Sequence, residues 1–360
     1  MLTDIDFMAR ALQLAERGRG RTSPNPLVGA VVVSPEGVVV GQGYHERAGE
    51  AHAEVNAIEA AGAATRGATL YCTLEPCSHV GRTGACTERI VTAGIVRVVA
   101  SVRDPNPLVH GRGFEYLRAH GVRVEIGMGA EQATHLNRPF FTFVCHRRPF
   151  VIMKAAISQD GRVAAAPGER TRLSSEESLR HAHVVRAEVD AIGVGSSTML
   201  VDNPELTVRG VHRERPLTRV IFHRRLRTAP SARVFSTLPQ GPVIILTSAR
   251  AVADAQEHVR SLTDVGATVT GLESSDVTAA LRHLGSHQVM SLVLEGGPTL
   301  QSAAWRAGSV DCLHLYTAPI SLGPNGVKWL PKEILSTLID TREERLGPDT
   351  FLEGYVHRTY

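Results

Sequence analysis

Apolar and polar positions alternate in short, regular blocks through the first third of the chain. A helix is predicted to begin with Thr3 as N-cap and Asp6 at the capping-box position, and to end at the Arg-Gly repeat of residues 17–20. Two β-branched runs at 27–33 and 38–43, separated by a Pro-Glu-Gly turn, predict a hairpin. Helices then follow at 52–61, 86–93 and 113–119, and strands at 68–73, 96–102 and 122–126. This alternation predicts a mostly parallel sheet covered by helices.

The second half resumes this pattern after a break. Residues 137–149 contain Arg-Pro and Arg-Arg-Pro and interrupt the alternation, so a domain boundary is expected near residue 146. The elements expected beyond it are helices at 175–186 and 299–307, and strands at 150–155, 191–195, 218–222, 243–247, 289–295, 312–318 and 351–357. Both halves are therefore expected to be α/β domains, covering 1–146 and 147–360.

Length and composition fit two soluble domains. The 360 residues exceed the roughly 100 to 200 of one domain. A composition that is 43% hydrophobic and 21% charged argues against disorder. The net charge is only +3 and no long run of one sign is present, so nucleic acid is not an expected partner. The N-terminal stretch is acidic and no apolar run reaches about 20 residues, so we expect a cytoplasmic protein that does not contact a membrane.

Three of the five cysteines, at 72, 77 and 86, lie close together. An odd number of cysteines in a long chain does not predict a disulfide framework. His52-Ala53-Glu54 precedes the Pro-Cys77 pair, and Cys86 follows. Zinc deaminases carry H-x-E followed by P-C-x-x-C, and here the second part is lengthened to C-x8-C. We therefore predict a zinc site made by His52, Cys77 and Cys86.

The chemistry of a deaminase requires these residue types. One imidazole and two thiolates leave one position of a tetrahedral zinc ion for water, whose pKa falls to about 7. Glu54 is then available to move protons. The alternative is that His52 caps a helix and the cysteines are small buried residues. Cys72 is expected in the core, and Cys145 and Cys312 have no partner pattern.

Short motifs surround these residues and continue through the second half. In the first half they are SPNPLVGA at 23–30, GYH at 43–45, HAEV at 52–55, TLEPCSH at 73–79 and GRT at 81–83. In the second half they are PFV at 149–151 with Lys154, DGR at 160–162, RAEVDAI at 186–192, DNP at 202–204, LTVR at 206–209 and EGGPT at 295–299. Together they resemble the bacterial bifunctional deaminase/reductase family of riboflavin biosynthesis.

The resemblance implies a fold and two activities. It implies an N-terminal cytidine-deaminase-like zinc domain and a C-terminal domain similar to dihydrofolate reductase. The first would hydrolyse the 2-amino group of a diaminopyrimidinone ribosylamino 5'-phosphate, and the second would reduce the ribose of the product to a ribityl chain with NADPH. A homo-oligomer is also expected. No G-x-G-x-x-G follows an early strand, so a Rossmann site is not supported.

The resemblance also implies binding residues. In the first domain the pyrimidine and ribosyl phosphate would contact Asn25, His45, Asp104 and Asn106. In the second domain the substrate would contact Lys154, Asp160, Arg170, Arg186, Leu206, Arg209 and Glu295. NADPH would contact Ala156, Arg172, Thr198, Asp202, Arg224, Gly297, Pro298, Thr299, Leu300, Gln301, Ser302 and Ala303. The alternatives are turn chemistry for the Asn and Asp residues, solvated arginines, and a lysine that reaches solvent.

Some positions depart from the family pattern. Arg172 stands where the family often has Trp, and its planar guanidinium is expected to stack on the cofactor instead. His223 stands where Asp is common, and Gly84-Ala85 replaces Pro-Pro before Cys86. Lys154 and Asp160 are expected to act near the reacting ribose as a cation and an acid.

Two other functions compete with this interpretation. One is a deaminase whose C-terminal domain binds a nucleotide but does not reduce. The other is a zinc-stapled binding protein without turnover. Glu54 argues against the second, because structural zinc needs no unligated carboxylate beside it.

Overall fold

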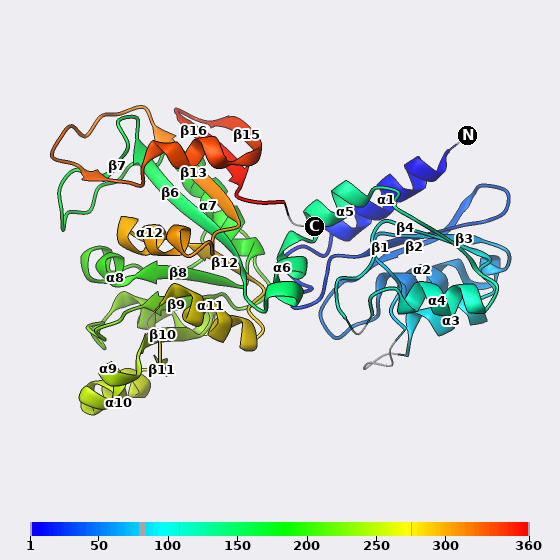
Figure 1. Ribbon diagram of the computed structural model, residues 1–360, viewed down its shortest axis with the longest axis horizontal. Coiled ribbons are helices and arrows are strands. Elements are labelled where there is room, and N and C mark those ends of the chain that lie inside the picture. The colour runs from blue at the N-terminus through cyan, green and yellow to red at the C-terminus, as the bar shows by residue number, and fades with distance from the viewer. Residues whose placement is uncertain (1, 79–83, 108, 275, 359–360) are drawn as a thin grey trace. The chain divides into compact units, whose positions relative to one another are not determined.

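The chain forms two compact units, which the computed structural model describes over residues 2–78, 84–107, 109–274 and 276–358 (Figure 1). One unit comprises the chain up to His146 and the other comprises Arg147–Arg358. His79 and the GRT motif at 81–83 lie outside the described residues. Within the described ranges, no helix has both the length and the apolar character needed to cross a bilayer.

The first unit contains a five-stranded sheet in the order β2-β1-β3-β4-β5. Its strands are β1 Gly29–Val33, β2 Val39–Tyr44, β3 Thr69–Cys72, β4 Arg97–Ala100 and β5 Arg123–Ile126. β1 pairs with β2 and β3 in antiparallel fashion, whereas β3, β4 and β5 are parallel. The predicted hairpin and the predicted parallel strands are confirmed, and the sheet as a whole is mixed.

Helices cover both faces of this sheet. They are α1 Asp4–Glu16, α2 Ala53–Ala61, α3 Cys86–Thr92, α4 Arg112–Ala119, α5 Ala130–Leu136 and α6 Arg138–His146, with a 3-10 turn, η1, at Gly62–Thr65. Figure 1 shows α1 and α5 on one face and α2, α3 and α4 on the other. The predicted capping box at Thr3 and Asp6 is present, and the Thr3 N–H donates to the Asp6 carboxylate at 2.7 Å. Gly29 lets α1 approach closely, because a Cβ there would lie 1.9 Å from the Ala11 carbonyl oxygen.

The stretch before the boundary is helical, which the sequence pattern does not predict. α6 lies within residues 137–149, which were expected to interrupt the alternation, and α5 lies where no element was predicted. Pro139 falls in the first turn of α6, where its missing N–H is tolerated, and Phe140 and Phe141 are buried. Between the helices, the Asn137 side chain accepts from the Leu27 N–H at 2.8 Å and donates to the Leu27 carbonyl at 2.9 Å. The helices thereby fix the segment that leads into β1.

The second unit contains a nine-stranded sheet in the order β11-β10-β9-β8-β12-β6-β13-β16-β15. Its strands are β6 Phe150–Ser158, β8 Ala191–Gly195, β9 Thr218–Phe222, β10 Val243–Ser248, β11 Ala267–Leu272, β12 Ser291–Leu294, β13 Cys312–Ala318, β15 Ile339–Leu346 and β16 Asp349–Tyr355. The seven strands from β11 to β13 are parallel, and β16 and β15 add an antiparallel edge. A separate pair joins β7 Arg162–Ala164 to β14 Val327–Lys328.

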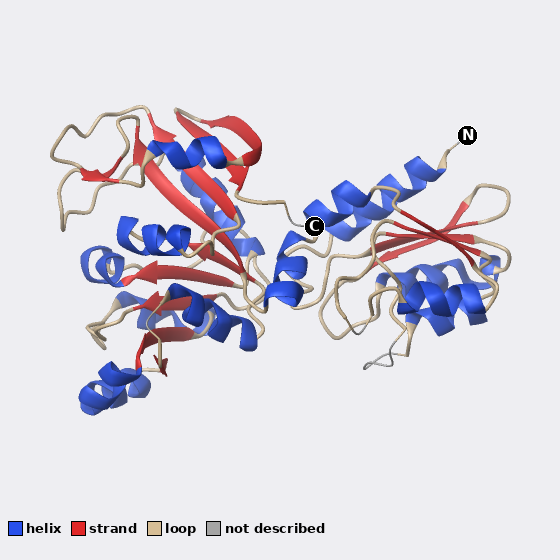
Figure 2. Cartoon of the chain, viewed as in Figure 1, coloured by secondary structure: helices blue, strands red, loops and turns tan. Residues whose placement is uncertain are grey.

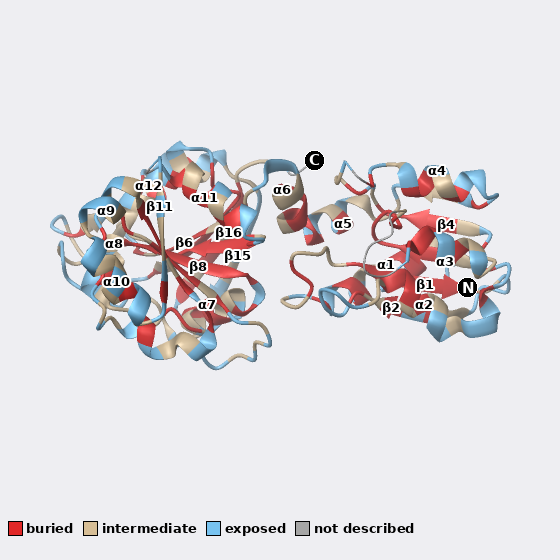
Figure 3. Cartoon of the chain, turned by 90° about the horizontal axis from the view of Figure 1, so that it is seen from below, coloured by how far each residue is buried: buried red, intermediate tan, exposed pale blue. Residues whose placement is uncertain are grey.

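Helices flank this sheet as well (Figure 2). They are α7 Glu176–Glu188, α8 Ser196–Asp202, α9 Ala249–Asp254, α10 Gln256–Asp264, α11 Val277–Ser286 and α12 Pro298–Arg306, with 3-10 segments η2 Arg233–Gln240 and η3 Lys332–Thr337. The central strands are buried between the helices (Figure 3), so the parallel α/β architecture predicted for this half is confirmed. Gly193 and Gly195 lie in β8, within the strand predicted at 191–195.

Candidate active sites

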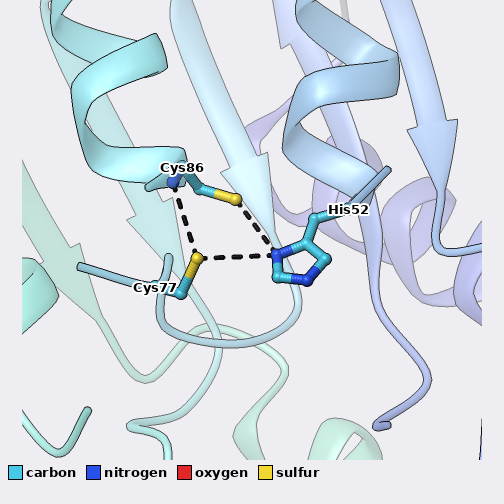
Figure 4. Close-up of side chains that lie close together, drawn as sticks. All are labelled: His52, Cys77 and Cys86. Atoms are coloured by element: carbon cyan, nitrogen blue, oxygen red, sulfur yellow. Dashed lines mark hydrogen bonds between the residues drawn. The ribbon is translucent and has the colours of Figure 1, made fainter. Parts of the chain in front are cut away.

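His52, Cys77 and Cys86 converge in the first unit, as Figure 4 shows. His52 is the N-cap of α2, Cys86 is the first residue of α3, and Cys77 lies in the segment between β3 and α3. The His52 Nδ1 atom is 3.2 Å from Cys86 Sγ and 3.5 Å from Cys77 Sγ. The Cys86 N–H donates to Cys77 Sγ at 3.5 Å, so the start of α3 helps to orient this sulfur.

The three donor atoms fit a zinc ion. Zn–S bonds of about 2.3 Å and Zn–N bonds of about 2.0–2.1 Å place neighbouring ligand atoms of a tetrahedral site roughly 3.5–3.8 Å apart. The two His–Cys separations are close to this, and all three ligand atoms lie within 4.8 Å of one another. Two thiols and one imidazole are a zinc-type donor set, and three protein ligands leave one position open.

The three donor groups share protons through the hydrogen bonds between them. The hydrogen bond with Cys77 raises the pKa of His52 to about 9, against the desolvation that burial imposes. The hydrogen bond from Cys86, with a further one from His52, lowers the pKa of Cys77 to about 4. The same bond to Cys77 raises the pKa of Cys86. Because a metal binds thiolate and neutral imidazole, loading the site displaces these protons.

Glu54 is a buried carboxyl on α2, and only 3% of its surface is exposed. Desolvation by burial raises the pKa of Glu54 to about 7, and the charge of His52 offsets this only in part. Glu54 and Cys86 each shift the pKa of the other, so the carboxyl borders the ligand cluster. A carboxyl that titrates near neutral pH suits a group that both takes and returns protons.

The structure brings Asn25 and His45 beside the cluster. The Asn25 Nδ2 atom is 3.0 Å from His45 Nε2, and His45 Nδ1 is 3.1 Å from the Ala51 carbonyl oxygen. The Ala51 carbonyl can only accept, so Nδ1 carries the proton and donates to it, while Nε2 accepts from the Asn25 amide and the ring is neutral. Burial lowers the pKa of His45, which agrees with this state. The His45 ring packs edge-on against His52, with ring centroids 5.5 Å apart.

Asp104 and Asn106 lie together on the loop between β4 and α4. The Asn106 N–H donates to Asp104 Oδ1 at 2.8 Å. Burial raises the pKa of Asp104 to about 6 despite this bond, and the charges of Glu75 and Cys77 add to the shift. Asp104 is therefore electrostatically coupled to the metal cluster. Glu75 holds this loop through hydrogen bonds from the Asp104 and Gly111 N–H groups, a role that the sequence analysis did not predict. The feature that could have indicated it is a glutamate directly before the Pro-Cys pair.

In the second unit Lys154, Arg186 and Glu295 form one ionic cluster. Lys154 lies on β6, Arg186 on α7, and Glu295 directly after β12. The Arg186 guanidinium donates two hydrogen bonds to the Glu295 carboxylate, at 2.6 and 2.7 Å. The Lys154 Nζ atom is 3.8 Å from Glu295 Oε2. The structure thus brings these three predicted substrate contacts together. Two of the Arg186 donors are already engaged by the Glu295 carboxylate.

Charge rather than proton sharing characterises this cluster. Burial opposes ionisation of Glu295, but the Arg186 and Lys154 charges lower its pKa to about 2. Desolvation lowers the pKa of Lys154, which makes it a better proton donor than an exposed lysine. Burial, with the nearby arginines, lowers the pKa of His183 to about 4, and His183 Nδ1 accepts from the Arg209 N–H at 3.2 Å.

Four other predicted substrate residues are placed differently. Leu206 is buried in the core with a φ of 56°. The Arg209 side chain is 65% exposed, and Arg170 is exposed. The Asp160 carboxylate accepts from the Ser158 hydroxyl and from the N–H groups of Leu322 and Gly323. These bonds lower the pKa of Asp160 to about 2, so the acid role expected from the sequence does not suit it.

A cavity of about 260 Å³ lies at the carboxyl ends of the parallel strands β8, β9 and β10. The starts of α8, α11 and α12 close it, and in α/β folds such positions bind ligands. The predicted cofactor residues that line it are Arg224, Gly297, Pro298, Thr299, Leu300 and Ala303. The N-terminus of α12, with Gly297 as N-cap, supplies N–H groups suited to a phosphate. The cavity therefore suits a phosphate-bearing part of a nucleotide.

The remaining predicted cofactor residues do not line this cavity. They are Ala156, Arg172, Thr198, Asp202, Gln301 and Ser302. Arg172 is exposed, and Gln301 is buried with its amide hydrogen-bonded to the Lys154 carbonyl and to the Trp329 indole. His223 lines the cavity, but both of its ring nitrogens are engaged, by Thr228 and by the Arg227 N–H. His223 thus orders the turn that carries Arg224.

Sequence reasoning also missed polar side chains on β13. The Lys154 ammonium lies 5.4 Å from the centroid of the Tyr316 ring, and the Tyr316 hydroxyl bonds His181 Nδ1 at 2.8 Å. Cys312 and His314 precede Tyr316 at alternate positions of the strand and lie near Glu353. The sequence feature that could have indicated these side chains is the polar residue at every second position of a buried strand, which places them on one face of the sheet.

Two family models match the chain. The cytidine and deoxycytidylate deaminase zinc-binding region matches residues 1–102, which include the three ligands and Glu54. The RibD C-terminal domain matches residues 149–352, which include the ionic cluster and the cavity.

Curated proteins and solved structures are similar over nearly the whole chain. The riboflavin biosynthesis protein RibD of Aquifex aeolicus is 39% identical over 357 residues, covering 97% of this chain and 98% of the relative. RibD of Escherichia coli is 38% identical, covering 98% and 99%. The structure of Acinetobacter baumannii RibD matches with a TM-score of 0.86 at 33% identity, covering 98% of both chains. A deaminase/reductase from Thermotoga maritima matches with a TM-score of 0.84 at 33% identity and the same coverage.

Proposed function

The chain belongs to the RibD family of bifunctional riboflavin biosynthesis enzymes, and from this premise we propose which unit and which residues perform each reaction. The first unit is the deaminase and acts on diaminohydroxyphosphoribosylaminopyrimidine, the substrate named for the Thermotoga maritima relative. The second unit is the reductase and acts on 5-amino-6-(5-phosphoribosylamino)uracil. A zinc-stapled binding protein is set aside by this membership.

Deamination is assigned to the cluster of His52, Cys77 and Cys86 with Glu54 beside it. When bound, zinc supplies a water of lowered pKa. Glu54 would take one proton from that water and deliver it to the ring nitrogen, and would then take the second proton from the hydroxyl added to the ring and give it to the amino group, which leaves as ammonia. The oxygen adds to the ring carbon, the carbon–nitrogen bond breaks, and a carbonyl replaces the amine. Asn25 and His45 orient the pyrimidine at this site.

Reduction is assigned to the ionic cluster and the neighbouring cavity. NADPH, when bound, supplies the hydride that the ribose carbon accepts. The start of α12 would hold the pyrophosphate and Arg224 would hold the 2'-phosphate. Lys154 donates the proton that completes the reduction, because burial favours its neutral form and thereby eases proton release. Arg186 and Glu295 fix the position of Lys154 beside the substrate.

The observation that carries the assignment is the convergence of two thiols and one imidazole beside a buried, unligated glutamate. The test is metal removal. Chelation is expected to abolish ammonia release from the diaminopyrimidine, and added zinc restores it. NADPH oxidation with the deaminated substrate continues unchanged throughout. Equal loss of both activities on chelation, or ammonia release by metal-free protein, contradicts the assignment.

A cytoplasmic location and a homo-oligomer are part of the proposal. NADPH and a phosphorylated pyrimidine are metabolites of the cell interior, which supports the location. Light scattering of the purified protein measures the assembly, and a mass near 38.8 kDa would contradict the oligomer.

A further inference from the structure

Glu75 is a buried carboxylate with three backbone donors. Its Oε2 atom accepts from the Asp104 N–H at 3.2 Å and from the Gly111 N–H at 2.9 Å. Its Oε1 atom accepts from the Gly113 N–H at 2.9 Å. Only 3% of the Glu75 surface is exposed. Asp104 and Gly111 belong to the connection between β4 and α4, and Gly113 lies in the first turn of α4, so one side chain ties that loop to the start of the helix.

The backbone on both sides is shaped for this contact. The Glu75 N–H donates to the Val102 carbonyl at 3.0 Å, which joins the segment after β3 to the start of the loop. Gly111 has a φ of 81°, a left-handed conformation that glycine adopts without strain. A Cβ on Gly113 would lie 2.1 Å from the Pro76 carbonyl oxygen, so only glycine permits this approach. The close fit links the loop to the residue that precedes metal ligand Cys77.

The loop also carries Asp104 and Asn106, which are assigned to the pyrimidine pocket. Asp104 and Asn106 are joined by the bond from the Asn106 N–H, and His110 Nδ1 is 3.1 Å from the Asp104 carbonyl oxygen. The position of Asp104 and Asn106 relative to the metal cluster therefore depends on what holds the loop against the Glu75–Cys77 segment.

We propose that Glu75 is a positioning residue of the deaminase, which fixes the Asp104–Asn106 loop against the metal-ligand segment and thereby sets pyrimidine affinity. This inference rests on the proposed function of the first unit. Glu75 acts through the loop, so its loss weakens substrate binding more than the chemical step. Other contacts hold the three metal ligands, so we expect them to keep their positions when Glu75 is replaced.

The sharpest variant is Glu75→Gln. A glutamine has one acceptor oxygen, and its amide N–H₂ would face a backbone N–H, so at least one of the three bonds is lost. Losing a hydrogen bond to a charged group corresponds to a change in an equilibrium constant, here that of substrate binding, of roughly tenfold or more. We expect KM for the diaminopyrimidine to rise by at least that factor, kcat to change less, and zinc content to stay at one per chain. Loss of zinc, or an unchanged KM, overturns the proposal.

Three comparisons separate positioning from a general loss of structure. Glu75→Asp keeps the carboxylate and is expected to give a KM between those of wild type and Glu75→Gln. Glu115→Gln, an exposed glutamate on α4, is the matched control with wild-type kinetics. Combined with Asn106→Ala, Glu75→Gln adds little to the KM of the single variant, because both act through one loop. If the increase in KM of the double variant equalled the product of the two single increases, the proposal would be overturned.

Hydrogen exchange provides a readout that needs no activity. The amides of Asp104, Gly111 and Gly113 are expected to exchange at least roughly tenfold faster in Glu75→Gln than in wild type. If wild-type protein released no ammonia, the proposed function would fail while the exchange result still tested the loop contact. If Glu75→Gln did not fold, Gly111→Ala would disturb the same bond by strain and should raise KM likewise. Unchanged exchange at all three amides contradicts the role of Glu75.

Discussion

The two reaction centres differ in how the chain assembles them. The first takes its metal ligands from helix starts and a short connecting segment, at positions 52, 77 and 86. The second takes Lys154, Arg186 and Glu295 from β6, α7 and the end of β12. Strand β12 pairs with β6 in the sheet, and this pairing brings Glu295 beside Lys154. A local motif makes the first centre, and sheet topology makes the second.

Their electrostatics differ in the same way. In the first centre, burial raises the pKa of Glu54 to about 7, so this carboxyl can take and return a proton. In the second, a buried ion pair fixes charge, and the pKa of Glu295 lies at about 2. The comparison predicts that the first centre is sensitive to loss of a proton carrier and the second to loss of a charge.

The largest expected effect is that of Glu54→Gln. Glutamine cannot carry a proton between water and the ring nitrogen, so ammonia release falls by about 100-fold to 10,000-fold. Zinc content and NADPH oxidation with the deaminated substrate stay at wild-type values. Metal analysis and the two separate assays measure this. Substantial ammonia release by the zinc-loaded variant would remove Glu54 from the mechanism.

The second prediction concerns the stability of the reductase unit. The pKa of Glu295 lies at about 2, below its ordinary value of 4.5, so its ionised form stabilises the fold. This contribution, about 3 kcal/mol, is fully present above pH 4.5 and is lost as the pH falls toward 2. Glu295→Gln is therefore expected to lower the free energy of unfolding at pH 7 and to differ less from wild type at pH 3.

Tryptophan fluorescence can measure the free energy of unfolding of the second unit alone. The chain has two tryptophans, Trp305 and Trp329, and both lie in the second unit. Urea unfolding followed by their emission therefore reports the reductase unit. Glu333→Gln, at an exposed glutamate of η3, is the control. A difference between wild type and Glu295→Gln that is equal at both pH values would show that the ion pair has no such role.

A smaller effect is expected at the cofactor cavity. Arg224→Ala removes a guanidinium from the cavity wall and should raise the dissociation constant of NADPH about tenfold. NADH, which lacks the 2'-phosphate, should bind as to wild type. Arg225→Ala, a neighbour outside the cavity lining, is the matched control. Calorimetric titration with both cofactors measures the two dissociation constants. An equal loss of affinity for NADPH and NADH would place the 2'-phosphate elsewhere.

The smallest effect is expected from Arg172→Ala. The side chain is exposed, and an exposed stacking or cation–π contact contributes about 0.5–1 kcal/mol. The dissociation constant of NADPH should rise roughly two- to fivefold. The same titration measures it, with Arg172→Trp expected to bind at least as tightly as wild type. A loss above tenfold would mean that Arg172 is a main cofactor contact.

The comparison also explains what the sequence could predict. The capping box at Thr3 and the helix start at Cys86 are local features, and both are confirmed. α6 was missed because Arg-Pro suggests a break, whereas Pro139 in a first turn does not stop a helix. β15 was missed because its side chains are largely charged and exposed, as befits a sheet edge.

The sites follow the same rule. The convergence of His52, Cys77 and Cys86 could be predicted from their spacing, because two of them lie at helix starts and the third lies in the short segment before Cys86. The bidentate bond from Arg186 to Glu295 could not, since it depends on which strands become neighbours. Residues such as Gln301 and Leu206 were expected to bind ligands, but the fold buries them. Burial is a tertiary property that a motif does not contain.

The most direct test of two successive reactions in two separate units is the stoichiometry of one reaction mixture. Zinc-loaded protein is given the diaminopyrimidine and NADPH, and ammonia and NADPH oxidation are followed together. We expect one NADPH oxidised for each ammonia released, with ammonia appearing first. Mixed with the Glu54→Gln protein, the same substrate should give neither product, while the deaminated substrate is still reduced. NADPH oxidation without prior ammonia release, or ammonia release that no oxidation follows, would contradict the account.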